Sequence, residues 1–301
     1  MTVQGALRQT TRALRASDGG SFEAALLLSN VLGRDRAWLL AHGEETLTVG
    51  NLKALEALTA RRSRGEPLAY VLEEAWFFGR RFVVTPHVLV PRPETECIVE
   101  TALADLRSRS HAGAALRACD VGTGSGAIAL TLAAELRSLE VVATDLSPEA
   151  LGVARRNAAL LHVAQRVRFV QGDLAEPLFA FAPYDCLVAN LPYVPTRDVP
   201  LPPDPVSFEP RLAVDGGADG LDLYRRLISH LPRLLAARAT AYFEAAPPAL
   251  DALADLIERN LRGAHLEIGE DYAGLERWVA ISLTSASRGR SAHSDEGVQP
   301  V

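Results

Sequence analysis

The segment DCLVANLPYVPT, residues 185–196, ends an apolar run on residues that could bind a substrate. The letters CLVA are typical of a buried strand, and Asn190 follows them directly with a carboxamide oxygen that can accept hydrogen bonds. Pro192 favours an extended conformation at Leu191, which would expose the Leu191 carbonyl as a second acceptor. Tyr193 would add a flat wall on which a planar group could stack.

Two acceptors and a ring suit a planar NH₂ group. The nitrogen of an amide is a poor nucleophile because its lone pair is delocalised. Acceptors for both N–H bonds would hold that nitrogen in line with a methyl donor and stabilise the positive charge that develops during transfer. No general base is then needed before attack. The competing interpretation is an ordinary strand-ending turn with a buried tyrosine.

A glycine-rich turn precedes this segment in LRACDVGTGSGAIALTLAAEL, which has the pattern of a strand running into a helix. Glycines lack a Cβ atom, so the backbone can turn sharply and a ligand can lie against it. The candidate cofactor-binding residues of this turn are Asp120, Gly122, Thr123, Gly124, Ser125 and Gly126. A purely structural glycine turn is the alternative.

Acidic residues follow the next two predicted strands. Asp145, at the tip of the second strand, could accept hydrogen bonds from both ribose hydroxyls of an adenosine. Ser147 ahead of Pro148 is a good helix N-cap, so capping does not require Asp145. Asp173 lies where such enzymes often bind the adenine amino group, and Leu174 beside it is a further candidate. For Asp173, a loop carboxylate that starts a turn is an equal alternative.

The spacing of the glycines separates two cofactor classes. A nicotinamide dinucleotide would place its pyrophosphate on the helix N-terminus, usually with G-x-G-x-x-G spacing. Here the third glycine comes one residue earlier. A donor without phosphates has no need of that anion site, so the spacing favours S-adenosylmethionine.

Composition excludes several classes of protein. A net charge of −6 and an isoelectric point of about 5.7 argue against binding held mainly by phosphate contacts. The three cysteines, Cys97, Cys119 and Cys186, have no metal-ligand spacing. The sequence contains no secretory apolar core and no run long enough to span a bilayer. We therefore expect a cytoplasmic protein with no metal and no membrane contact.

Alternating strands and helices should position these residues. The predicted strands are 116–121, 140–144, 167–171, 184–189, 239–244, 264–268 and 277–283, and the predicted helices are 94–108, 126–137, 147–161, 220–237 and 248–261. This alternation predicts an α/β fold with helices on both faces of a parallel sheet. Ligands of such folds bind at the carboxyl ends of strands, near the switch in strand order. Asn190 would therefore face the methyl group of the donor and is also a candidate cofactor-binding residue.

Four segments are expected along the chain. Apolar spacings of three and four predict a helical bundle before the sheet, with Ser21 as an N-cap and Gly33 as a C-cap. Aromatic and β-branched residues then predict a short hairpin, and the polar end of the chain predicts disorder. The boundaries are 1–74 for the bundle, 75–92 for the hairpin linker, 93–284 for the methyltransferase domain and 285–301 for the tail.

Nearly the whole chain, to about residue 283, resembles the HemK/PrmC family of protein-(glutamine-N5) methyltransferases that act on peptide chain release factors. The resembling stretches are RRSRGEPLAYVLEEAWFFGRRFVVTPHVLVPRPETE, DVGTGSGAIAL, TDLSPEAL, FEPRLAVDGGADGLDLYRRLI and DYAGLERWVA. The order of motifs behind PRPETE is specific. The resemblance implies a class I S-adenosylmethionine-dependent methyltransferase fold, Rossmann-like with a seven-stranded mixed sheet, behind a small N-terminal helical domain.

The resemblance also implies roles for the residues. Gly122 to Gly126 and Asp145 would hold the donor, while Asn190, the Leu191 carbonyl and Tyr193 would hold the glutamine in the GGQ loop of a release factor. The N-terminal bundle would help to grip that partner. The protein would act as a monomer without direct contact to nucleic acid.

Two departures from the family pattern keep alternatives open. The family usually has N-P-P-Y, and Leu191 here retains a backbone carbonyl but not the fixed φ of proline. FEAAPPAL, residues 243–250, lacks the glycine and glutamine usually seen after that strand's Glu. Because N-L-P-Y also occurs in ribosomal RNA adenine dimethylases, an adenine-N6 methyltransferase acting on nucleic acid is one alternative. A donor-binding protein without turnover is the other.

Overall fold

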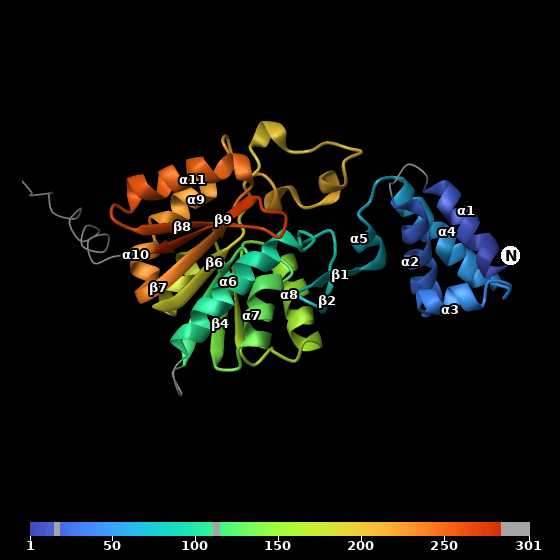
Figure 1. Ribbon diagram of the computed structural model, residues 1–301, viewed down its shortest axis with the longest axis horizontal. Coiled ribbons are helices and arrows are strands. Elements are labelled where there is room, and N and C mark those ends of the chain that lie inside the picture. Colours follow the sequence, from blue (N-terminus) through green and yellow to red (C-terminus); the bar gives the residue numbers. More distant parts are fainter. Residues whose placement is uncertain (15–18, 111–114, 284–301) are drawn as a thin grey trace, which may run out of the picture. The chain divides into compact units, whose positions relative to one another are not determined.

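The computed structural model describes residues 1–14, 19–110 and 115–283 (Figure 1). The chain divides into two compact units. Met1–Glu74 and Pro200–Phe208 form the first, and Ala75–Val199 with the described chain from Glu209 forms the second. The sequence had assigned residues 200–208 to the methyltransferase domain. Within the first unit, the Pro203 carbonyl oxygen lies only 2.9 Å from the point that a Cβ atom on Gly65 would occupy.

Helices build the first unit: α1 (Val3–Ala13), α2 (Gly20–Leu32), α3 (Arg36–Ala41), α4 (Val49–Ser63) and α5 (Leu68–Leu72). Their apolar faces meet in one core that includes Leu27, Leu28 and Leu39. Gly33 ends α2 with a left-handed φ of 62°, as predicted. The prediction for Ser21 was wrong, because α2 begins at Gly20 and Ser21 lies inside it.

A two-stranded hairpin, β1 (Glu74–Phe77) and β2 (Arg80–Val83), opens the second unit and confirms the predicted hairpin. Its turn contains Gly79 at a φ of +68°. The side chain of Asn157 binds both backbone groups of Val83, at 2.7 Å to the nitrogen and 2.9 Å to the oxygen. This fixes the start of the segment that runs on towards the sheet.

The sheet of the second unit has the order β5-β4-β3-β6-β7-β9-β8. The first five strands in this order are parallel, and β9 is antiparallel to both neighbours, so the expected seven-stranded mixed sheet is confirmed. The strands are β3 (Leu116–Val121), β4 (Leu139–Asp145), β5 (Val167–Gln171), β6 (Tyr184–Ala189), β7 (Leu235–Glu244), β8 (His265–Glu270) and β9 (Glu276–Ser282).

Helices cover both faces of this sheet, as the alternation predicted. The core on one face includes residues of α6 (Glu94–Arg109), α7 (Ala127–Glu135) and α8 (Pro148–Leu160). The core on the other includes residues of α9 (Asp222–Ile228), α10 (Leu231–Leu234) and α11 (Pro247–Asn260). None of the described helices has the length and apolarity needed to cross a membrane.

The prediction of a single helix over 220–237 was wrong. This segment contains two helices, α9 and α10, and β7 already begins at Leu235. The cause is Pro232, which has no N–H to donate to the carbonyl of Ile228 and whose ring would clash with that carbonyl in a continuous helix.

Candidate active site

The strand order brings the predicted site residues to one edge of the sheet. β3 lies between β4 and β6, and the chain switches sides there after β5. Val121 pairs with Thr144 on one side and with Ala189 on the other. Gly122 and Asn190 therefore follow the ends of β3 and β6, and Asp145 ends β4 beside β3. β4 and β6 are two strand spacings apart, about 10 Å.

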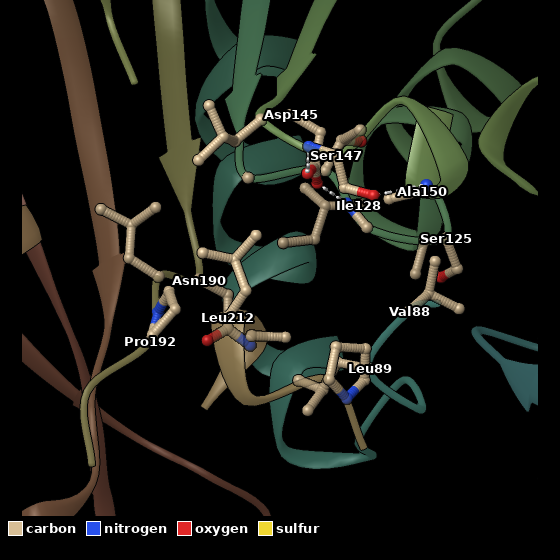
Figure 2. A pocket seen from close by; sticks show the side chains of 18 of the residues that line it. Val88, Leu89, Ser125, Ile128, Asp145, Ser147, Ala150, Asn190, Pro192 and Leu212 are labelled. Atoms are coloured by element: carbon tan, nitrogen blue, oxygen red, sulfur yellow. Dashed lines mark hydrogen bonds between the residues drawn. The ribbon is translucent and has the colours of Figure 1, made fainter. Parts of the chain in front are cut away.

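A cavity of about 260 Å³ opens at this edge. Figure 2 shows side chains from several segments around it: Val88 and Leu89 before α6, Ser125 and Ile128 at the start of α7, Asp145 and Ser147 at and just after the end of β4, Asn190 and Pro192 after β6, and Leu212 before α9. All the residues that line it belong to the second unit.

The glycine loop is tied to β4 by its backbone. The N–H groups of Gly122 and Thr123 donate to the Thr144 carbonyl at 2.9 and 2.8 Å. Gly126 has a φ of +84°, and a Cβ atom there would lie 2.8 Å from Leu130 Cδ1. Gly124 is also left-handed, yet its missing Cβ would meet no atom within 4 Å. The loop therefore presents bare backbone to open space, where a ligand can approach closely.

The Asp145 carboxylate holds the loop and the next helix together. One oxygen accepts from the Gly124 N–H at 2.8 Å and the other from the Ser147 N–H at 2.9 Å. The Ser147 hydroxyl caps α8 by accepting from the Ala150 N–H, as predicted. Burial raises the pKa of Asp145, and the backbone donors offset part of that rise. A third backbone donor, the Leu146 N–H, also reaches this carboxylate. The two oxygens offer about four acceptor sites, so one remains for a ligand hydroxyl.

Asp120 stabilises the glycine loop through hydrogen bonds and is not among the residues lining the cavity. It is fully buried, and one of its oxygens accepts from Thr123 Oγ1 at 2.6 Å and from the Ala129 N–H at 3.1 Å. Within the described chain its other oxygen, Oδ1, has no partner. Burial raises the pKa of Asp120 to about 7.

Asp173 and Leu174 also line the cavity. Asp173 is paired with Arg226 of α9, a partner that sequence reasoning missed. Leu174 has a φ of 46°, and its carbonyl accepts from the Thr144 hydroxyl at 3.3 Å. Contact of Asp173 with an adenine amino group stays a prediction.

The carboxamide nitrogen of Asn190 donates hydrogen bonds to two protein side chains. It donates to Thr95 Oγ1 at 3.2 Å and to the carboxylate of Glu244. Both partners face the nitrogen end of the carboxamide, because a carboxylate can only accept hydrogen bonds. Its oxygen is therefore the atom left for the cavity that Asn190 lines.

Leu191 is buried, and its backbone is close to the hydroxyl of Tyr224. The Leu191 N–H donates to that hydroxyl at 3.2 Å, while the Leu191 carbonyl lies 3.5 Å from it. The single hydroxyl proton of Tyr224 goes to the closer carbonyl of Glu244. The Leu191 carbonyl thus retains its capacity to accept, and both Leu191 and Pro192 line the cavity.

Tyr193 is not among the residues that line the cavity. It packs against the core on the α9 side, and burial raises its pKa to about 12. Its predicted role as a stacking wall stays a prediction.

The glycines of VDGGADG secure the segment after β6. The Gly216 N–H donates to the Val194 carbonyl at 2.8 Å, and the Thr196 N–H donates to the Gly217 carbonyl at 2.8 Å. A Cβ atom on Gly216 would lie 2.6 Å from the Pro192 carbonyl oxygen. Only glycine allows this approach, so the loop fixes the backbone that carries the two acceptors.

Sequence reasoning also missed Thr95, Glu244 and Arg92. Arg92 lines the cavity and forms an ion pair of 2.7 Å with the buried Glu209. Thr95 and Arg92 lie in PRPETE, and Glu244 ends a predicted strand. Polar residues at such positions are the signal that could have found them. The described residues contain no cluster of His, Cys, Asp and Glu suited to a metal ion.

Comparison with known proteins identifies the family. A family model described as the PrmC N-terminal domain matches residues 5–72, and one described as a methyltransferase domain matches residues 118–201. The release factor glutamine methyltransferase of Bordetella pertussis is 44% identical over 256 residues, which span 85% of this chain and 92% of that protein. The chain belongs to the release factor glutamine methyltransferase family.

Further members of the family match over nearly their whole length. The relative from Moorella thermoacetica is 40% identical over 92% of this chain and 97% of its own, and that from Bacillus subtilis is 36% identical over 94% and 98%. A solved structure, the hMettl16 catalytic domain in complex with the MAT2A 3'UTR hairpin 6, has a TM-score of 0.52 at 18% identity over 75% of this chain and 82% of that one. That likeness concerns the fold alone.

Proposed function

We propose that this chain transfers the methyl group of S-adenosylmethionine to the side-chain nitrogen N5 of the glutamine in the GGQ motif of a peptide chain release factor. The observation that carries the proposal is the Asn190 carboxamide, whose nitrogen is held by Thr95 and Glu244 so that its oxygen is left for the cavity. Membership of the family supports the choice of substrate.

The residues of the cavity fit the donor. Gly124 leaves open space beside the backbone, and the Asp145 carboxylate can accept a further hydrogen bond, which suits a ribose hydroxyl. Apolar side chains such as Val88, Leu89 and Ile128 suit the rest of the nucleoside. When bound, this cofactor supplies an electrophilic methyl group.

The acceptors after β6 would hold the substrate. Asn190 Oδ1 and the Leu191 carbonyl take the two N–H bonds of the glutamine amide and keep its nitrogen directed at the donor site. They also stabilise the positive charge that develops on this nitrogen. A proton then leaves to water, so no general base is required. Replacement of proline by Leu191 keeps the backbone acceptor, and the glycines around Gly216 restrain the segment instead.

We also propose that the chain acts as a cytoplasmic monomer without a nucleic-acid partner, and that residues 1–74 bind the body of the release factor. The test is incubation of the release factor with enzyme and donor, followed by mass spectrometry of the GGQ peptide. One added methyl group on the glutamine is expected. An unmodified peptide would contradict the proposal, and labelled methyl on RNA or DNA in parallel reactions would favour adenine methylation instead.

A further inference from the structure

Glu244 is a buried carboxylate without an evident structural partner for one of its oxygens. It ends β7, next to β6, and Phe243 before it pairs with Ala189 just before Asn190. Its exposed fraction is 1%, and within the described chain Oε2 has no hydrogen-bond partner. Thr95, in the first turn of α6, is also buried and contacts both Glu244 and Asn190.

The direction of the hydrogen bonds in this group follows from the chemistry of its members. Thr95 accepts from the Asn190 nitrogen and has one hydroxyl hydrogen of its own, which it donates to Glu244. An ionised carboxylate can only accept. If the carboxamide of Asn190 were reversed, its oxygen would face the carboxylate, and the two acceptors would repel each other.

We propose that Glu244 is a positioning residue for methyl transfer, which acts partly through Thr95 to keep the Asn190 oxygen turned towards the cavity. The inference rests on the proposed function, in which that oxygen holds the glutamine nitrogen. It assigns a role to a buried charge that would otherwise only destabilise the fold.

The charged and titratable groups around Glu244 make this role depend on pH. Burial raises the pKa of Glu244 to about 7, and Glu94 of α6 also raises it, while Arg277 of β9 lowers it. Tyr193 and Tyr224 also lie close and stay protonated, since burial raises the pKa of both hydroxyls. A protonated Glu244 can donate as well as accept, so both orientations of the carboxamide become possible. Transfer should therefore increase as pH rises through about 7 and then level off.

Variants of two residues test the inference. Single-turnover transfer to the release factor is measured with saturating donor from about pH 5 to about pH 9. Glu244→Gln and Thr95→Val should lower the rate roughly 10- to 100-fold above pH 7, the scale of a lost hydrogen bond to a charged group. Glu244→Gln should also lose the rise in rate near pH 7, and Thr95→Ser, which keeps the hydroxyl, should retain it.

Two further readouts and a control variant separate positioning from a general structural role. Donor affinity by calorimetry and KM for the release factor should change little in both damaging variants, so that the loss is confined to kcat. The exposed Glu267 of β8 provides the matched control, and Glu267→Gln should behave as the wild type. A wild-type rate and an unchanged pH profile in Glu244→Gln would overturn the inference.

The failure of the proposed function would be recognised separately. If the wild type transfers no methyl group to the release factor, the proposed substrate is wrong. The positioning claim is then read from crystal structures of the Glu244→Gln variant. A mixed or reversed Asn190 carboxamide supports it, and a carboxamide still bonded through its nitrogen to Thr95 overturns it.

Discussion

Replacement of Asn190 by alanine removes the proposed substrate acceptor and leaves the donor site intact. The loss of one acceptor that acts in the transition state lowers transfer by about 100- to 1000-fold. The substitution also removes the 3.2 Å bond to Thr95 and the bond to Glu244, which together contribute about 2–4 kcal/mol to stability. Thr95 keeps its bond to Glu244, so the variant should fold. The contacts of Asp145 with the glycine loop are unchanged, and the donor Kd should stay within about threefold of the wild type.

The assay is single-turnover transfer of labelled methyl to the release factor with saturating donor, alongside calorimetry of donor binding. Asn260→Ala is the matched control, because this exposed carboxamide at the end of α11 donates to the carbonyl of Leu256 and is not among the residues lining the cavity. It should leave transfer unchanged. If Asn190→Ala transferred within about fivefold of the wild-type rate, the reasoning from the transition-state acceptor would be refuted.

Three other variants test the residues that bind the donor or hold the glycine loop in place. Asp145→Ala should raise the donor Kd roughly 10- to 100-fold by calorimetry, because charge-assisted hydrogen bonds to the ribose are lost. Gly126→Ala should lower the free energy of unfolding by about 1–3 kcal/mol in urea titrations, since it combines a φ of +84° with a Cβ that would lie 2.8 Å from a leucine methyl group. Burial raises the pKa of Asp120 to about 7, so its contribution to stability is complete below about pH 4 and is lost as pH rises through about 7. Asp120→Asn cannot ionise and should gain stability relative to the wild type across that window, by at most about 1.4 kcal/mol per pH unit.

Each of these has an outcome that would count against it. An unchanged donor Kd in Asp145→Ala would remove this carboxylate from the donor site. Gly152→Ala is the control for Gly126, since this glycine in α8 has no atom within 4 Å of its missing Cβ, and the substitution should raise stability by about 0.5–1 kcal/mol. Equal effects of the two alanines would contradict the strain argument. For Asp120→Asn, a stability difference that does not vary with pH would exclude ionisation as the cause.

The parts of the fold that depend on local pattern could be predicted from the sequence. Each strand of the sheet was expected within a few residues of its observed bounds, because apolar β-branched runs between helical patterns are strong signals. The Ser147 cap was also local and correct. The prediction of one helix over 220–237 was wrong because it followed the apolar spacing and overlooked the break that Pro232 imposes.

The residues that hold the site side chains in place come from distant parts of the chain, and no local sequence pattern indicates them. Thr95 lies 95 residues before Asn190, and Arg226 lies 53 residues after Asp173. Their meeting depends on which helix covers which face of the sheet. For the same reason the sequence could not indicate that Asp145 is already bonded to the glycine loop or that Tyr193 is not among the residues lining the cavity.

The central claim is that Asn190 presents its oxygen to a planar nitrogen beside the donor. A crystal structure with the demethylated donor product and a GGQ peptide tests it most directly. The account predicts the Asn190 oxygen and the Leu191 carbonyl within hydrogen-bond distance of the glutamine nitrogen, with the Asn190 nitrogen still bonded to Thr95. A carboxamide turned into the protein interior, with the glutamine bound elsewhere, would contradict it.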